Sequence, residues 1–226
     1  MATDNVKTIN LDFFQQALKA QQRNTKATYR LELEADSVTK ALAMVYQTEV
    51  EERGLTCVFD EATKDCIRKV AEWLCRGRKN GLLMAGFVGN GKTTMLKAVA
   101  RLFALLHIEY EDGNRRLYRN VRYVSALELT RIAADTTQKA WLEEVKRTPM
   151  LAIDDVGTEP TVVKNYGNEI SPLTEVLYYR YDQRLWTMMT SNLKEEDFQE
   201  RYGVRIADRI REMFNILAYN HKSYRQ

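Results

Sequence analysis

The sequence is poor in the residues that crosslink chains, ligate metals or interrupt structure, with 3 cysteines, 2 histidines and 3 prolines among 226 residues. Cys57, Cys66 and Cys75 are odd in number and have no Cys-x-x-Cys spacing, so we expect reduced thiols rather than disulfides or a metal clamp. His107 and His221 lie far apart in the sequence, and neither is beside a candidate nucleophile. No site built on histidine or cysteine is therefore expected.

Long apolar runs are also missing. The longest, such as 81–89 and 102–106, fall far short of the roughly 20 residues that cross a bilayer. The amino terminus lacks the basic start and apolar stretch of a secretion signal, so we expect a cytoplasmic protein with no membrane partner. An excess of 34 Lys and Arg over 31 Asp and Glu gives a net charge of +3, which permits DNA binding without requiring it.

Short apolar runs alternate with helical stretches along most of the chain, which is typical of a parallel α/β sheet. Each apolar run ends in small or acidic residues. The apolar runs are 82–85, 121–124, 150–153, 187–190 and 215–218. The helical stretches between them are 93–106, 126–133, 138–146, 172–181 and 206–214.

The first 55 residues have a different composition. They contain one glycine, Gly54, and Phe13, Phe14 and Leu18 recur at helical spacing, which predicts a few short helices. Asp60 can cap a further helix whose apolar positions lie between 66 and 74. We therefore predict a helical, partner-binding amino-terminal segment over 1–55 and one larger α/β domain over 56–226.

Gly86-x-x-x-x-Gly91-Lys92-Thr93 fits the P-loop pattern and lies between an apolar strand and a helical run, the context that the pattern requires. The glycines let backbone N–H groups point at phosphates, and the helix that follows presents its positive end to them. Lys92 should reach the β and γ phosphates, the Thr93 hydroxyl should ligate Mg²⁺, and Thr94 should give a supporting contact. The expected ATP contacts are Gly86, Val88, Gly89, Asn90, Gly91, Lys92, Thr93 and Thr94. A glycine-rich turn with no ligand is the alternative.

A P-loop also needs a carboxylate at the end of a neighbouring strand, and the run ending Ile153-Asp154-Asp155 supplies two. Asp154 is expected to hold the Mg²⁺ shell, and Asp155 to orient or polarise the attacking water. The run ending Thr190-Ser191-Asn192 places an amide within reach of the γ phosphate, so Asn192 is the candidate sensor. An acidic loop and an ordinary turn or helix cap are the alternatives.

Together these motifs resemble the AAA+ ATPases, and within them the branch that holds DnaC-type replicative helicase loaders and IstB-type transposition helper proteins. The resemblance covers about residues 55–226. Beside the P-loop, the matching segments are 153–159, 179–181, 190–192 and 202–210, of which the last two make the match specific.

The resemblance implies an AAA+ core, with a central parallel sheet flanked by helices and no helical lid domain after it. It also implies an arginine that enters the ATP site of a neighbouring subunit, and Arg209 matches that position. Arg205 and Arg211 compete with it, and a solvated basic helix is the alternative. Arg225, in an ending similar to the loaders' terminal Ser-x-Arg, is a candidate second nucleotide-sensing arginine.

The implied function is ATP hydrolysis by an oligomer of this chain that acts in DNA replication on a replicative helicase or another DNA-processing protein. Single-stranded DNA is a further expected partner. The loop residues 88–90 and the segment 1–55 depart from the relatives' pattern, so an IstB-like helper or an ATP-switched DNA-binding adaptor is the alternative function. A small-molecule kinase is disfavoured because nothing between 155 and 187 resembles an arginine-rich lid.

Basic residues and tyrosines alternate before and within the second apolar run. They are Arg115, Arg116, Tyr118, Arg119, Arg122 and Tyr123. Such a set could grip single-stranded DNA by charge and stacking. A solvated face is the preferred interpretation, because basic residues are common on protein surfaces.

Overall fold

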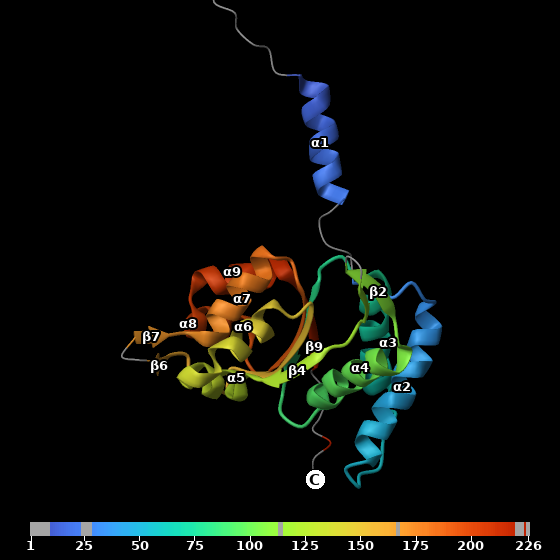
Figure 1. Cartoon of the computed structure of the whole chain (residues 1–226). Helices are drawn as coiled ribbons and strands as arrows, with labels where there is room; N and C mark the ends of the chain where they lie inside the picture. The colour runs from blue at the N-terminus through green and yellow to red at the C-terminus, as the bar shows by residue number, and fades with distance from the viewer. Residues whose placement is uncertain (1–9, 24–28, 113–114, 166–167, 220–223, 225–226) are drawn as a thin grey trace, which may run out of the picture.

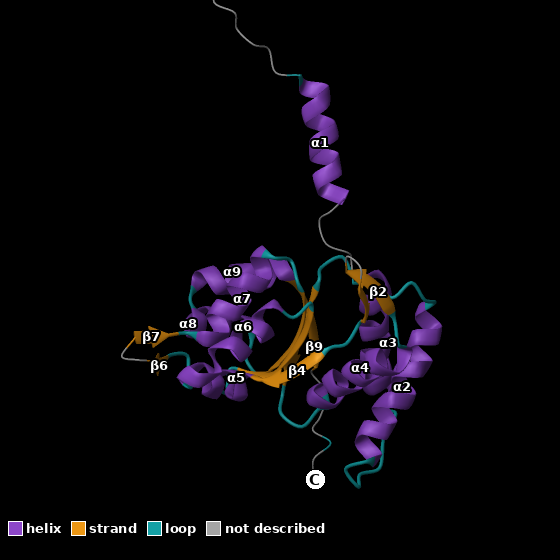
Figure 2. Cartoon of the chain, viewed as in Figure 1, coloured by secondary structure: helices purple, strands orange, loops and turns teal. Residues whose placement is uncertain are grey.

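A five-stranded sheet lies between two layers of helices in the computed structural model (Figure 1, Figure 2), which describes residues 10–23, 29–112, 115–165, 168–219 and 224. The strand order is β4-β5-β8-β1-β9, and all neighbouring strands are parallel. The strands are β1 (Gly81–Gly86), β4 (Arg122–Ser125), β5 (Met150–Val156), β8 (Trp186–Ser191) and β9 (Phe214–Tyr219). The predicted α/β fold is confirmed, and each predicted apolar run forms one strand.

The core is divided between the two faces of the sheet, because the side chains of each strand point to the two faces in turn. Leu82 and Met84 belong to the cluster that packs against one helical layer, while Leu83 between them belongs to the cluster of the other. Because successive side chains of a strand point to opposite faces, a strand buried on both faces reads as one apolar run. The first layer contains α2 (Ala35–Glu51), α3 (Glu61–Arg76) and α4 (Lys92–Leu106). The second contains α5 (Ala126–Ala134), α6 (Lys139–Arg147), α7 (Pro172–Asp182), α8 (Glu195–Tyr202) and α9 (Val204–Met213).

The amino-terminal helices differ from each other in their packing. Helix α1 (Leu11–Arg23) projects away from the rest of the molecule in Figure 1, and its described side chains, those of 11–18, are all exposed. Helix α2 instead buries Val38, Leu42 and Tyr46 in the core beside α3 and α4. The boundary at residue 55 stays a prediction, but α2 is structurally part of the α/β core.

The structure contains short elements that the sequence patterns did not indicate. Helix α8 buries a single apolar side chain, Phe198, so it has no apolar stripe to detect. Two antiparallel hairpins, β2 (Glu109–Asp112) with β3 (Arg115–Tyr118) and β6 (Val163–Asn165) with β7 (Asn168–Ile170), stand outside the main sheet. A 3-10 turn, Thr136–Gln138, precedes α6. Within the described part of the chain, none of the helices is both long enough and apolar enough to span a bilayer.

The parallel arrangement decides where polar side chains gather. Strand β8 pairs with β1 on one side and β5 on the other, so the carboxyl ends of the three strands meet at one edge. In open α/β sheets this edge is where ligands bind. The P-loop follows β1, Asn192 follows β8, and Asp154 and Asp155 lie near the end of β5.

Candidate nucleotide-binding site

The loop between β1 and α4 requires glycine at two positions. Gly91 has φ +90°, and a Cβ there would lie 2.4 Å from the hydroxyl of Tyr46. At Gly86, with φ +152°, a Cβ would lie 2.2 Å from the carbonyl oxygen of Tyr219. The loop is thus pressed closely against α2 on one side and β9 on the other, and neither glycine can be replaced without moving backbone or a buried ring.

The amine of Lys92 lies inside this loop. Its Nζ donates to the carbonyl oxygens of Gly86 (2.8 Å) and Phe87 (2.7 Å) and to Oδ1 of Asn90 (3.1 Å). It also donates to Oδ1 of Asn192 at 3.0 Å, so the amide predicted as the γ-phosphate sensor lies beside the P-loop lysine. A buried ammonium whose acceptors include neutral carbonyl and amide oxygens can exchange them for an anion.

Asn90, one of the three loop residues that depart from the relatives' pattern, is buried and donates through Nδ2 to the carbonyl oxygen of Tyr219 at 2.6 Å. Its two ends therefore connect Lys92 to the end of β9. Val88 is exposed and Gly89 accepts a backbone hydrogen bond from Tyr224 at 2.9 Å. Arg225, the predicted second sensor, lies outside the described residues.

Asp154 is buried and accepts three hydroxyl hydrogen bonds. Oδ1 accepts from Thr93 at 3.1 Å and from Thr190 at 2.5 Å, and Oδ2 accepts from Tyr123 at 2.7 Å. Thr93 and Asp154 were predicted to share a Mg²⁺ ion, and the structure brings the two side chains together. Among the described residues no group of three or more His, Cys, Asp or Glu side chains is placed to hold a metal. One carboxylate and one hydroxyl suit Mg²⁺, which keeps several waters and binds phosphate oxygens as well.

Tyr123 is a residue beside the site that sequence reasoning did not connect with Asp154, and it is 37% exposed. It was grouped with the basic residues around it, yet its hydroxyl faces Asp154. Burial and the adjacent carboxylate raise the pKa of this tyrosine, so it stays a donor at neutral pH. The signal that could have found it is register, because β4 pairs with β5 and Tyr123 lies opposite Ala152, two residues before the acid.

Asp155 follows with an exposed side chain and a positive φ of 55°. Its backbone N–H donates to Thr190 Oγ1 at 2.8 Å, and its carbonyl accepts from Thr158 Oγ1 at 2.8 Å. These bonds hold a backbone conformation that is costly for a residue with a Cβ, and such conformations cluster at active sites. Asp154 is therefore buried in the polar cluster, whereas the side chain of Asp155 is exposed.

Arg209 lies on α9, away from the P-loop of its own chain. Its guanidinium carbon stacks 4.1 Å from the ring centroid of Tyr178 and 4.7 Å from that of Tyr181, and Nη1 is 3.8 Å from Asp182. Its side chain is 33% exposed. The two tyrosines hold the guanidinium in a fixed position at the surface, as an arginine acting on another subunit would require.

The competing arginines have different surroundings. Arg211 donates to the carboxylate of Glu195 at 2.7 Å, so its charge is already paired. Arg205 is exposed and makes no polar side-chain contact with the described residues. Arg211 is also partly exposed, but a carboxylate holds it at 2.7 Å, whereas Arg209 is held mainly by two aromatic rings.

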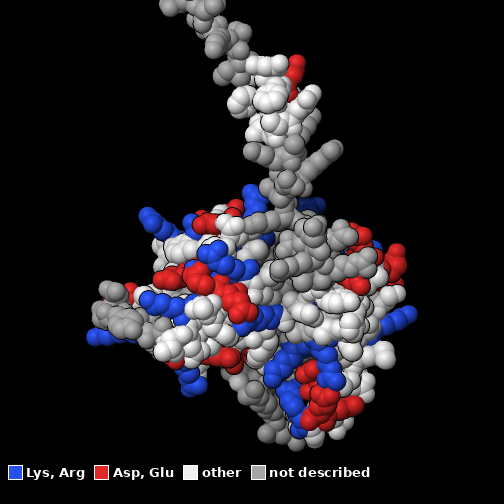
Figure 3. Space-filling model, viewed as in Figure 1, with Lys and Arg blue, Asp and Glu red and all other residues white. Residues whose placement is uncertain are grey.

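The described members of the basic cluster have separate partners. Arg122 donates to Glu144 at 2.6 Å and stacks on Trp141 at 4.9 Å, while Arg119 donates to the carbonyl oxygen of Arg30 at 3.2 Å. Tyr118 is exposed. The side chains of Arg115 and Arg116 lie outside the described ones. On the face in Figure 3, basic and acidic side chains are interspersed rather than gathered by sign.

The chain is similar in sequence to the replicative helicase loader DnaI of Bacillus subtilis (strain 168), with 29% identity over 160 residues. That match covers 71% of this chain and 47% of DnaI, so the chain spans about half the length of its curated relative. No family model matches the chain. The predicted resemblance to helicase loaders of this type is confirmed at the level of sequence similarity.

Solved structures share the fold. A crystal structure of DnaI superposes with a TM-score of 0.58 at 21% identity, covering 80% of this chain and 93% of that one. A structure of the replication initiator DnaA bound to the ATP analogue AMPPCP and single-stranded DNA has a TM-score of 0.51 at 16% identity, covering 72% of this chain and 47% of DnaA. The sheet and its flanking helices therefore have the same fold as these two structures.

Proposed function

We propose that this chain is a cytoplasmic AAA+ ATPase that assembles with copies of itself and acts on a replicative helicase during DNA replication. The observation that carries the proposal is the meeting of Lys92, Asn192, Thr93 and Asp154 at the carboxyl edge of β1, β5 and β8. A lysine for phosphate, a hydroxyl–carboxylate pair for Mg²⁺ and an amide for the γ phosphate are the parts that phosphoryl transfer needs.

Each residue has a stated task in this proposal. The Lys92 amine leaves the loop carbonyls for the β and γ phosphates, and the backbone amides of 88–93 surround them. Thr93 and Asp154 hold Mg²⁺, which would neutralise charge on the phosphates. Asp155 orients the attacking water, Asn192 contacts the γ phosphate, and the resemblance assigns Arg209 to a neighbour's site.

The partner is inferred from similarity to the loaders and from α1. Leu11, Phe14 and Leu18 are exposed by 70%, 53% and 53%, and at spacings of three and four residues they share one side of the helix. An exposed apolar helix face is typical of a segment that docks on another protein. We therefore assign helicase binding to the segment 1–55 and place the contact on α1.

Affinity capture with a purified replicative helicase tests the proposal. The full chain should capture the helicase more strongly with Mg-ATP than with Mg-ADP, and Lys92→Ala should abolish the difference. Phe14→Asp in α1 should weaken capture while ATP binding is kept. Gln16→Asp, on the opposite side of the same helix, is the matched control.

Two results would contradict the proposal. A folded wild-type chain that takes up no Mg-ATP would remove the ATPase function. Capture of a transposase rather than a helicase, with normal ATP binding, would keep the ATPase and favour the transposition helper.

A further inference from the structure

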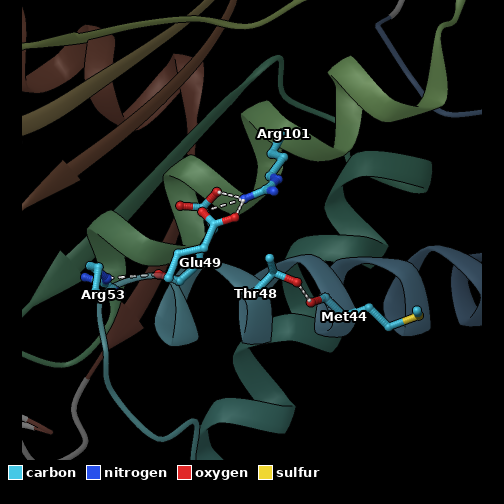
Figure 4. A network of polar contacts seen from close by, with 6 residues as sticks. Met44, Thr48, Glu49, Arg53 and Arg101 are labelled. Atoms are coloured by element: carbon cyan, nitrogen blue, oxygen red, sulfur yellow. Dashed lines mark hydrogen bonds and ion pairs between the residues drawn. The ribbon is translucent and has the colours of Figure 1, made fainter.

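A second cation contacts the first turn of the P-loop helix, at the threonine next to the one that meets Asp154. Arg53 lies just beyond the carboxyl end of α2, and its Nη2 donates to Oγ1 of Thr94 in the first turn of α4 at 2.6 Å. Its Nε donates to the carbonyl oxygen of Glu49 at 2.9 Å, which fixes the guanidinium against its own helix (Figure 4). The charge of Arg53 thus contacts Thr94, which is two residues along the chain from Lys92.

The surroundings of Arg53 contrast with those of Arg101, the other arginine between α2 and α4. Arg101 donates to the carboxylates of Glu49 at 3.2 Å and Glu52 at 2.8 Å (Figure 4). Arg53 has neutral oxygens as its acceptors, and no carboxylate of the described residues lies within ion-pair distance of it. A guanidinium carries five N–H donors, so Arg53 can bind an anion without giving up either bond.

The two threonines of the P-loop helix define two sides of the site. Thr93 faces β5, where its hydroxyl meets Asp154, whereas Thr94 faces α2, where its hydroxyl meets Arg53. The side of Asp154 is where Mg²⁺ and the β and γ phosphates are expected. A group on the side of α2 is therefore directed towards the other end of the triphosphate.

We propose that Arg53 is a nucleotide-binding residue that contacts the α-phosphate end of ATP and of ADP, in addition to Thr94. The inference rests on the proposed ATP binding at this site and deepens it, because it adds a second protein cation from a different helix. Since α2 carries the charge, an occupied site holds the end of α2 against the first turn of α4.

Nucleotide affinity of the Arg53 variants tests the inference. Arg53→Gln should weaken both Mg-ATP and Mg-ADP by a similar factor, roughly 10- to 100-fold, because one charge-assisted phosphate contact is lost in each case. Arg53→Lys should recover part of the loss, since it keeps the charge without the planar fork. Affinities are measured by displacement of a fluorescent nucleotide at two salt concentrations, with melting of the free protein recorded alongside.

Arg101→Ala is the matched control, because it removes an arginine from the same helix pair but not from the site. It should leave both affinities unchanged. If Arg53→Gln kept wild-type affinity for both nucleotides, whether or not its melting temperature fell, the residue would only join α2 to α4. A loss confined to ATP would place the contact at the γ phosphate and overturn the assignment. If the wild-type chain itself bound no nucleotide, the proposed function would fail first.

Discussion

At the scale of single residues, the carboxylate of Asp154 is held by neighbouring side chains. Three hydroxyls, from Thr93, Thr190 and Tyr123, donate to its two oxygens. Each comes from a different element, α4, β8 and β4 respectively. The orientation of the carboxylate is thus decided by the sheet and by the helix that follows the P-loop, before any metal arrives.

Tyr123→Phe removes one of these donors and leaves the ring in place. We expect the Mg²⁺ concentration for half-maximal ATP hydrolysis to rise about tenfold or more, since losing an outer-shell partner typically costs 10- to 100-fold in metal affinity or activity. The measurement is a Mg²⁺ titration of hydrolysis at saturating ATP. Tyr118→Phe, an exposed tyrosine nearby on β3, should behave as wild type, and an unchanged titration for Tyr123→Phe would refute a role at the metal.

At the scale of elements, helix α9 presents Arg209 from a platform built by α7. Tyr178 and Tyr181 lie on α7 at helical spacing and stack on the guanidinium. Arg209→Ala should bind ATP with wild-type affinity but hydrolyse it about 10- to 1,000-fold more slowly. Arg211→Ala, which removes an arginine already paired with Glu195, should lose much less.

Mixing variants tests whether Arg209 acts between subunits. A mixture of Arg209→Ala with Lys92→Ala creates interfaces that have an intact P-loop on one side and an intact arginine on the other. Hydrolysis should therefore recover in the mixture, although each variant alone hydrolyses ATP poorly. Absence of recovery in mixtures shown to co-assemble would place Arg209 in the site of its own chain.

Elements with a strong apolar pattern could be predicted from the sequence, and those without one could not. All five sheet strands were found. The run 150–153 is apolar because its successive residues are buried on opposite faces of the sheet, whereas the edge strands β4 and β9 are only partly buried. The hairpin of β2 and β3 was missed although Asp112-Gly113 is a turn signal, because the sequence of 109–118 is rich in charged residues and has no apolar run. Among site residues, the P-loop and Asp154 follow a fixed spacing, whereas Tyr123 and Arg53 reach the site only through strand pairing and helix packing.

At the scale of the whole molecule, a ligand that binds only the folded chain should stabilise it. Mg-ATP at about 100 times its dissociation constant adds roughly 2.7 kcal/mol to the free energy of unfolding, or about 5 to 10 °C in melting temperature for a chain of this size. Lys92→Ala should lose most of this shift. Removing residues 1–23 should leave it unchanged, because the described side chains of α1 are exposed, and a smaller shift would contradict the independence of α1 from the site.

The position of β8 has a consequence for synthesis of the chain. This strand, fourth of the five in sequence, is inserted between β5 and β1, and it brings both Thr190 and Asn192. A nascent chain that has emerged only to residue 185 carries a complete P-loop motif and both acidic residues. Its sheet, however, still lacks β8, the strand that lies between β5 and β1. Nucleotide affinity should therefore arise late and abruptly during translation, once the middle of the sheet closes.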